Sequence, residues 1–205
     1  MTGSRLRGVY TLFAKEVWRF MKVFVQTILT PVVTALLYLL VFGQALEGNV
    51  EVYEGVTYSA FLIPGLMMMS IIQNAFANTS SSLIQSKMMG NLVFVLLSPI
   101  SSLEFFIAFI AAAILRGVMV ALAVYLVAII FIDLPLLEMW AIVVFAVLGS
   151  ATLGVLGLIA GVWAEKFDQL AGFQKFFILP LSFLSGVFYS IHSLPGVWQT
   201  VSQFN

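Results

Sequence analysis

The stretch SKMMGNLVFVLLSPISSLE, residues 86–104, separates two apolar segments that are each long enough to cross a bilayer. It carries the least membrane-like run of small, polar and turn-forming residues in the chain. Pro99 lacks a backbone N–H and disfavours helix at the residue before it, so a helix here should end near Ser98. We therefore predict a short helix from about Gln85 to Leu97 that connects two membrane spans. With the turn that follows, this segment covers residues 85–98.

The composition indicates an integral membrane protein of the all-α class. Of the 205 residues, 62% are hydrophobic and only 9% are charged, and the mean hydropathy is +1.11. Soluble domains are about 25% charged and about half apolar, so lipid has to be the solvent for this much apolar surface. The apolar runs are continuous rather than alternating, which favours helices over a β-barrel. We treat residues 1–205 as a single transmembrane domain.

The first 22 residues predict an amphipathic helix. Its apolar face contains Leu6, Val9, Tyr10, Phe13, Val17, Phe20 and Met21, and its polar face contains Arg5, Lys15, Glu16, Arg19 and Lys22. Leu12 does not fit this division. The pattern is typical of an interfacial helix on an anionic membrane surface. The alternative is a charge cluster that serves only to orient the chain in the membrane.

Five membrane spans follow from runs of roughly 20 apolar residues. They are predicted at about Val23–Phe42, Tyr58–Asn78, Leu103–Ile132, Trp140–Trp163 and Gly172–Tyr189, and the segment 193–205 predicts a short external amphipathic piece. The third helix should take Ser101 or Ser102 as its N-cap. Pro31 predicts a kink in the first span, and Pro180 interrupts the fifth.

Two features inside the spans allow more than one interpretation. Arg116 either snorkels from near the inner boundary to water or binds substrate in a pathway. Ala146, Ser150 and Gly154, and likewise Gly157 and Gly161, are spaced four apart on the fourth span. Such spacing permits close helix packing, either within one subunit or at a dimer seam.

The distribution of charges predicts a cytoplasmic N-terminus. Five basic residues precede the first span, and the other loops with basic residues alternate with loops that have none. The acids Glu47, Glu51, Glu54, Asp133 and Glu138 lie in the loops predicted to be outside.

Several chemistries have no support in the sequence. There is no phosphate-binding loop of the Walker type, no cysteine, and one histidine, His192, which cannot assemble a catalytic set. The net charge of +0 suggests no nucleic-acid partner. No acid lies deep in a span, which disfavours a proton-driven carrier. We expect no catalytic residue, no metal and no directly bound cofactor, and an energy source on another protein.

The chain resembles the type-2 ABC export permeases over essentially its whole length. The resemblance is carried by Lys15-Glu16-x-x-Arg19-Phe20-Met21, Gln26-Thr27, Pro31, Leu37-Tyr38, Phe42-Gly43, Pro64-Gly65-Leu66, Met68-Met69-Ser70, Asn74-Ala75, Ala77-Asn78, Leu96-Leu97-Ser98-Pro99-Ile100, Arg116-Gly117, Leu184 to Tyr189, Leu194-Pro195, Trp198-Gln199 and Asn205. No single motif is specific, but their order and spacing together are.

The resemblance implies a homodimer of permeases in the bacterial inner membrane, surrounded by lipid, in which each permease docks one cytoplasmic ATPase that holds ATP and magnesium. The segment 85–98 then matches the family's coupling helix, with Lys87, Gly90, Asn91, Leu96, Leu97, Ser98 and Pro99 as coupling candidates. Lys15, Glu16 and Arg19 belong to a second contact, the N-terminal helix. Gln73, Asn74, Asn78 and Arg116 are candidates for the pathway lining. Interhelical hydrogen bonding is the alternative for the three amides.

Two departures from the family pattern qualify this expectation. Val93 stands where many members have an acid, and the family pattern continues beyond Asn205 into a sixth span, so we expect a C-terminally incomplete permease. The expected function is export of an amphiphilic drug, lipid or polysaccharide-type substrate. The alternative hypothesis is a non-transporting membrane scaffold or an inactive truncated permease.

Overall fold

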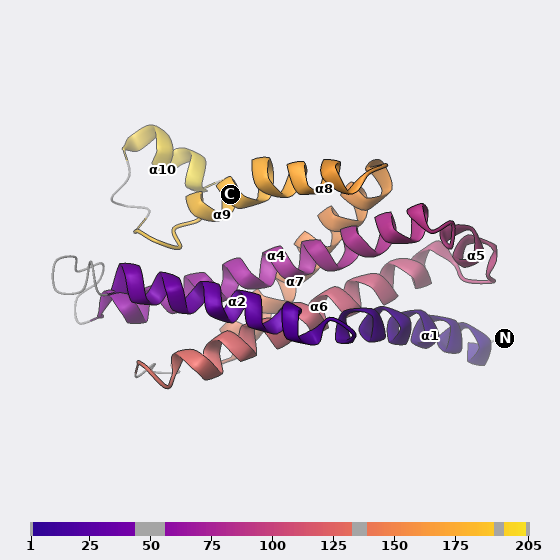
Figure 1. Ribbon diagram of the computed structural model, residues 1–205, viewed down its shortest axis with the longest axis horizontal. Helices are drawn as coiled ribbons and strands as arrows, with labels where there is room; N and C mark the ends of the chain where they lie inside the picture. The colour runs from indigo at the N-terminus through magenta and orange to yellow at the C-terminus, as the bar shows by residue number, and fades with distance from the viewer. Residues whose placement is uncertain (1, 44–55, 133–138, 191–194, 204–205) are drawn as a thin grey trace.

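A computed structural model describes residues 2–43, 56–132, 139–190 and 195–203. The acids predicted for the external loops and His192 lie outside these ranges, as does part of the segment 193–205. Within them the regular structure is helical, with no strand. Figure 1 shows most helices running lengthwise, with α1 (Thr2–Met21) and α5 (Leu92–Leu97) at one end and α10 (Gly196–Gln203) at the other.

Four helices in the described ranges are long and apolar enough to cross a membrane. They are α2 (Phe24–Tyr38) with its π-helical continuation η1 (Leu39–Gly43), α4 (Tyr58–Met88), α6 (Ser102–Ala128) and α7 (Met139–Trp163). These helices confirm the first four predicted spans. Because successive spans run in opposite directions, α1, the α4–α6 connection and the α7–α8 connection all lie at the same end of the bundle (Figure 1).

The fifth predicted span corresponds to a segmented helix. It consists of α8 (Phe167–Phe173), the π-helical turn η2 (Gln174–Ile178) and α9 (Leu179–Leu184), and it is not one of the four helices above. It ends before Tyr189 because Gly186 adopts a left-handed conformation with φ of 81°, which is a common way to end a helix. Pro180 is the second residue of α9, in its first turn, where a missing N–H is tolerated. That this segment crosses the membrane stays a prediction.

The second span is longer than predicted, and the short helix after it is shorter. Residues 85–88 form the last turn of α4 rather than the start of a separate helix, so the predicted helix Gln85–Leu97 is wrong at its beginning. The chain turns at Gly90, whose φ of +71° favours glycine. The short helix α5 then begins at Leu92 and ends at Leu97, just before Ser98, as predicted from Pro99.

The extension of α4 has a tertiary cause. The hydroxyl of Thr79 donates a hydrogen bond of 2.8 Å to the carbonyl of Gly154 on α7. The ammonium of Lys87 donates to the carbonyls of Val162 and Ala164 at the end of α7. These bonds hold the polar second half of α4 in helical form after the apolar pattern has ended, which the sequence pattern alone does not reveal.

The start of α6 agrees with the prediction. The hydroxyl of Ser101 accepts from the backbone N–H of Glu104 at 3.3 Å, and the Glu104 carboxylate accepts from the N–H of Ser101 at 2.8 Å. This reciprocal capping box satisfies two N–H groups that the helix leaves free.

The small residues of α7 pack within the subunit. A side chain at Gly157 would meet the Thr79 hydroxyl and would lie 2.5 Å from the carbonyl oxygen of Phe76, both on α4. A Cβ atom at Gly161 would lie 2.9 Å from Leu83 of α4, and one at Gly154 would lie 3.1 Å from Ala113 of α6. The interface between α4 and α7 is the most extensive in the described fold. Of the two interpretations of this spacing, close packing within one subunit is therefore confirmed.

We expect Gly157→Ala to lower stability by about 2 kcal/mol, because the added methyl group overpacks a backbone contact that cannot shift cheaply. The measurement is the thermal unfolding of the purified chain in detergent. Gly172→Ala in α8 is the matched control, since nothing lies within 4 Å of a side chain at that position. Equal stability of the two variants would contradict the proposed role of the glycine.

Candidate functional site

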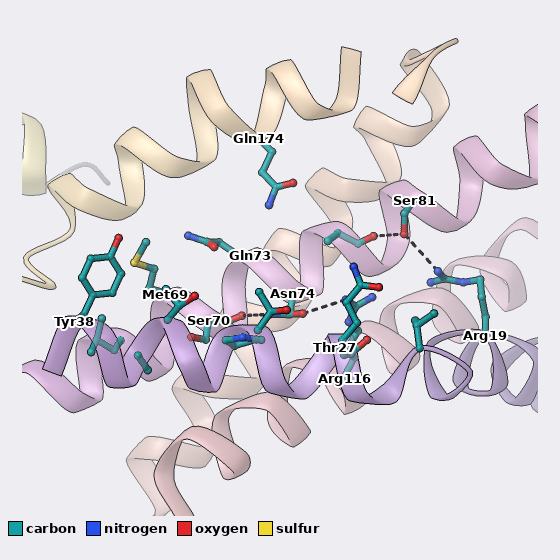
Figure 2. Close-up of a pocket in the computed structure, with 18 residues that line it drawn as sticks. Arg19, Thr27, Tyr38, Met69, Ser70, Gln73, Asn74, Ser81, Arg116 and Gln174 are labelled. Carbon is teal, nitrogen blue, oxygen red and sulfur yellow. Dashed lines mark hydrogen bonds between the residues drawn. The ribbon is translucent and has the colours of Figure 1, made fainter. Parts of the chain in front are cut away.

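The described residues enclose a polar cleft of about 450 Å³ between α2 and α4. Three further elements each place one side chain in it: Arg19 from α1, Arg116 from α6 and Gln174 from η2 (Figure 2). Its volume falls within the range of small-molecule sites. The remaining lining residues are Val23, Gln26, Thr27, Thr30, Pro31, Thr34, Ala35, Tyr38, Leu66, Met69, Ser70, Gln73, Asn74, Ala77 and Ser81.

One wall of the cleft is a polar stripe on α2 that the sequence analysis missed. Gln26, Thr30 and Thr34 are spaced four apart, which places them on one helical face, and all three line the cleft. Leu29 and Val33, on another face of the same helix, are exposed and do not line it. The signal that could have found this wall is a period-four run of polar residues within an apolar span.

The opposite wall is built from α4 and contains two of the predicted pathway residues. Gln73 and Asn74 both line the cleft. The amide of Asn74 donates to the carbonyl of Ser70 at 3.0 Å, which fixes its orientation. The amide nitrogen of Gln73 is buried and has no hydrogen-bond partner among the described residues.

Arg116 reaches the same cleft from α6. Its Nη2 donates to the side-chain oxygen of Asn74 at 3.1 Å, and its Nε is buried without a partner among the described residues. Arg116 is the fifteenth of the 27 residues of α6, and Asn74 is near the middle of α4, so the guanidinium is held at mid-length of the bundle. This geometry favours the pathway interpretation of Arg116 over snorkelling, although its role stays a prediction.

Asn78 does not line the cleft with the other two amides. It is completely buried, and its backbone and side-chain oxygens accept from Nη2 of Arg19 at 2.7 and 2.8 Å. Of the two interpretations that the sequence leaves open for Asn78, interhelical hydrogen bonding agrees with its position. Asn78 therefore joins α1 to α4 behind the cleft.

Glu16 requires a correction to the predicted polar face of α1. The amphipathic pattern predicts Glu16 on the polar face with the other charges, but it is completely buried. Its carboxylate accepts from Ser82 of α4 at 2.8 Å and from Nε of Arg19 at 3.1 Å, and Lys15 lies 3.3 Å away. The reason is that α1 docks on α4 and α6 through a face centred on Leu12, Glu16 and Phe20, all of them buried. The helical periodicity does not reveal this, because it groups residues on one face of α1 without specifying which neighbour lies opposite that face.

A second candidate surface lies at the end of the bundle that carries α5. Five large apolar residues there, the apolar end surface, are each more than half exposed: Met88, Met89, Phe94, Leu96 and Leu97. Val93 is exposed beside them. Leu92 and Val95 face the other way and pack with residues of α1 and α6, which anchors the short helix.

The other coupling candidates occupy different positions. Lys87 is engaged with the end of α7 and does not point freely outward. Gly90 and Asn91 form the exposed turn before α5, and the hydroxyl of Ser98 donates to the carbonyl of Val95 where α5 ends, just before Pro99. Their part in coupling stays a prediction.

The chain is similar to known transport permeases. The family model described as ABC-2 type transporter matches residues 7–205. The protein named Inner membrane transport permease YadH is 34% identical over 196 residues, which cover 95% of this chain and 76% of the relative, in Escherichia coli (strain K12), Escherichia coli O157:H7 and Shigella flexneri. No solved structure matches the chain.

If the cleft is filled with water, cysteines on its α2 wall will react with a membrane-impermeant thiol reagent. We expect Thr30→Cys and Thr34→Cys to react about ten times faster than Leu29→Cys and Val33→Cys, because only the thiolate is reactive and a lipid-facing thiol stays protonated. The chain has no native cysteine, so each variant reports one site. Equal labelling of the four positions would exclude a hydrated cleft.

We also expect Glu16→Gln to destabilise the docking of α1 by about 3 kcal/mol, because it leaves the partly buried Arg19 guanidinium without its counter-charge. This is the low end of the range for buried pairs, since the side chain of Arg19 is 21% exposed. The midpoint of thermal unfolding measures the effect. Lys15→Gln, which removes a partner that is 46% exposed, should cost less than about 1 kcal/mol. A reversed order would show that the pair is not the anchor of α1.

Proposed function

This chain belongs to the ABC-2 type transporter family, and we propose that it is the permease subunit of an ATP-driven exporter. Membership of this family indicates a membrane permease of an ABC transporter. The proposal adds outward transport, an amphiphilic drug, lipid or polysaccharide-type substrate, and energy from a separate ATPase subunit in the cytoplasm. The inner-membrane relatives and the apolar helices support a multi-pass protein of the inner membrane.

One observation carries the proposal of a docked ATPase: the apolar end surface is exposed, while the other side of α5 packs against the bundle. Five large apolar side chains lie together on it, and a patch of this kind marks an interaction site. Short turns connect α5 to α4 on one side and to α6 on the other. A soluble partner that moves α5 therefore acts directly on two membrane helices.

The N-terminal helix supplies a second mechanical connection. Val9 and Phe13 of α1 pack in the same cluster as Leu92 and Val95 of α5. Farther along α1, Glu16 and Arg19 are bonded to Ser82 and Asn78 of α4. A displacement of α1 and α5 would thus move the helix that carries Gln73 and Asn74 in the wall of the cleft.

In this mechanism the permease performs no chemistry of its own. ATP binding and hydrolysis, with magnesium, take place on the partner, and the permease converts the movement of its docked end into a change of the cleft. A second copy of the chain completes the pathway in the homodimer that the family resemblance implies. The N-terminus, the apolar end surface and the α7–α8 connection then face the cytoplasm, in agreement with the positions of the basic residues.

The test is co-purification from native membranes in mild detergent, with the partner identified by mass spectrometry. We expect a Walker-type ATPase at about one copy per permease, and we expect Leu96→Asp combined with Leu97→Asp to lose it, because buried carboxylates without partners destabilise an apolar interface. The control replaces two exposed apolar residues at the other end of the bundle, Val197→Asp with Val201→Asp, and should retain the ATPase.

Absence of any ATPase from the wild-type preparation would favour a non-transporting scaffold over the exporter. Retention of the ATPase by the double variant at Leu96 and Leu97 would instead keep the exporter but remove the apolar end surface as its docking site.

A further inference from the structure

We propose that the cleft binds an anionic headgroup, a phosphate or a carboxylate, of an amphiphilic substrate through the guanidinium of Arg116. This inference rests on the proposed function, since it names the chemical class of the transported molecule. It adds to that proposal that the charged part of the cleft binds the headgroup and that the other end binds the apolar chain of the substrate.

The balance of charge in the cleft leaves one positive charge without compensation. Two guanidinium groups line it, those of Arg19 and Arg116. Arg19 is paired with the buried carboxylate of Glu16 at 3.1 Å. Arg116 forms no ion pair with any described residue, and no described lining residue is an acid. A charge at mid-length of a membrane bundle is costly unless it is paired or faces a water-filled pathway.

The hydrogen bonds of Arg116 are also incomplete. Its bond to Asn74 is made to a neutral amide oxygen, while its Nε is buried and unpaired among the described residues. The amide nitrogen of Gln73, in the same cleft, is a second buried donor without a described partner. An anion offers several acceptor lone pairs and forms charge-assisted hydrogen bonds with a guanidinium. The unpaired donors and the uncompensated guanidinium therefore suit an anion, which would accept hydrogen bonds and balance the charge.

The shape of the cleft adds an apolar part to the ligand. Figure 2 shows Arg19 at one end, Arg116 and Asn74 between, and Tyr38 and Met69 at the other end. Leu66 and Ala35 also line the cleft. The charged end is the one nearer α1 and α5, which the sequence predicts to be cytoplasmic. A ligand with an anionic head and an apolar tail matches this polarity.

The experiment is a calorimetric titration of the full chain, purified in a neutral detergent, with octyl phosphate. Inorganic phosphate is the probe for the free anion, and octyl glucoside carries the same tail without charge. We expect Arg116→Gln to weaken octyl phosphate binding about tenfold or more, because it removes the charged donor. Arg116→Lys should retain most of the affinity. Lys175→Gln, which removes an exposed cation outside the lining, should bind as the wild type does.

The possible outcomes distinguish the headgroup of an amphiphile from a free anion as the ligand. Binding of octyl phosphate but not inorganic phosphate, lost in Arg116→Gln, supports an amphiphile headgroup. Equal, Arg116-dependent binding of inorganic phosphate supports an anion site in which the tail contributes little. Unchanged octyl phosphate affinity in Arg116→Gln, or octyl glucoside binding that Arg116→Gln weakens equally, overturns the proposal.

A structural role of Arg116 is tested by thermal unfolding of the same variants. We expect octyl phosphate to raise the unfolding midpoint of the wild type and not that of Arg116→Gln. If Arg116→Gln does not fold, Gln73→Leu takes its place: lower octyl phosphate affinity supports the site, and unchanged affinity overturns it. The titration needs no ATPase, so its failure leaves the exporter proposal standing, and failure of the co-purification leaves the anion site standing.

Discussion

The close contact between α4 and α7 is the constraint on which the rest of the bundle depends. Two membrane helices gain little from the hydrophobic effect when they meet in lipid, so they associate through close packing and interhelical hydrogen bonds. Gly157 and Gly161 allow α7 to lie directly against the backbone of α4, and Thr79 adds a hydrogen bond across the seam. One side of α4 is fixed in this way, and polar residues on its other sides contact α1 or line the cleft.

Five polar residues of α4 fall into three groups with different surroundings. Thr79 faces α7, Asn78 and Ser82 bind the charges of α1, and Gln73 and Asn74 face the cleft. The first two groups form hydrogen bonds to neighbouring helices, as buried polar groups in a membrane require, while the amide nitrogen of Asn78 has no partner among the described residues. The donors on Gln73 and Arg116 also lack a described partner, and both of these residues line the cleft. Lining the cleft is what distinguishes the donors available to a ligand from the polar groups that hold the helices together.

The same arrangement explains how a contact at one end of the bundle can act on the cleft. α4 carries cleft residues at mid-length and leads directly into the turn before α5. α1 is attached to it by the hydrogen bonds of Glu16 with Ser82 and of Arg19 with Asn78, and Arg19 itself lines the cleft. α1 and α4 thus connect the end of the bundle proposed to meet the ATPase with the cleft proposed to meet the substrate.

The sequence by itself determined the membrane class, the first four spans, the Ser101 cap and the end of α5 at Pro99, because each depends on local hydrophobicity or backbone chemistry. It also identified Gln73, Asn74 and Arg116 as candidates, since polar residues in apolar spans are conspicuous. Only the tertiary structure decided that α4 continues to Met88, that Glu16 is buried and that Asn78 lies behind the cleft. These features depend on which helix lies opposite each residue, and a periodic pattern specifies a face of one helix but not its neighbour.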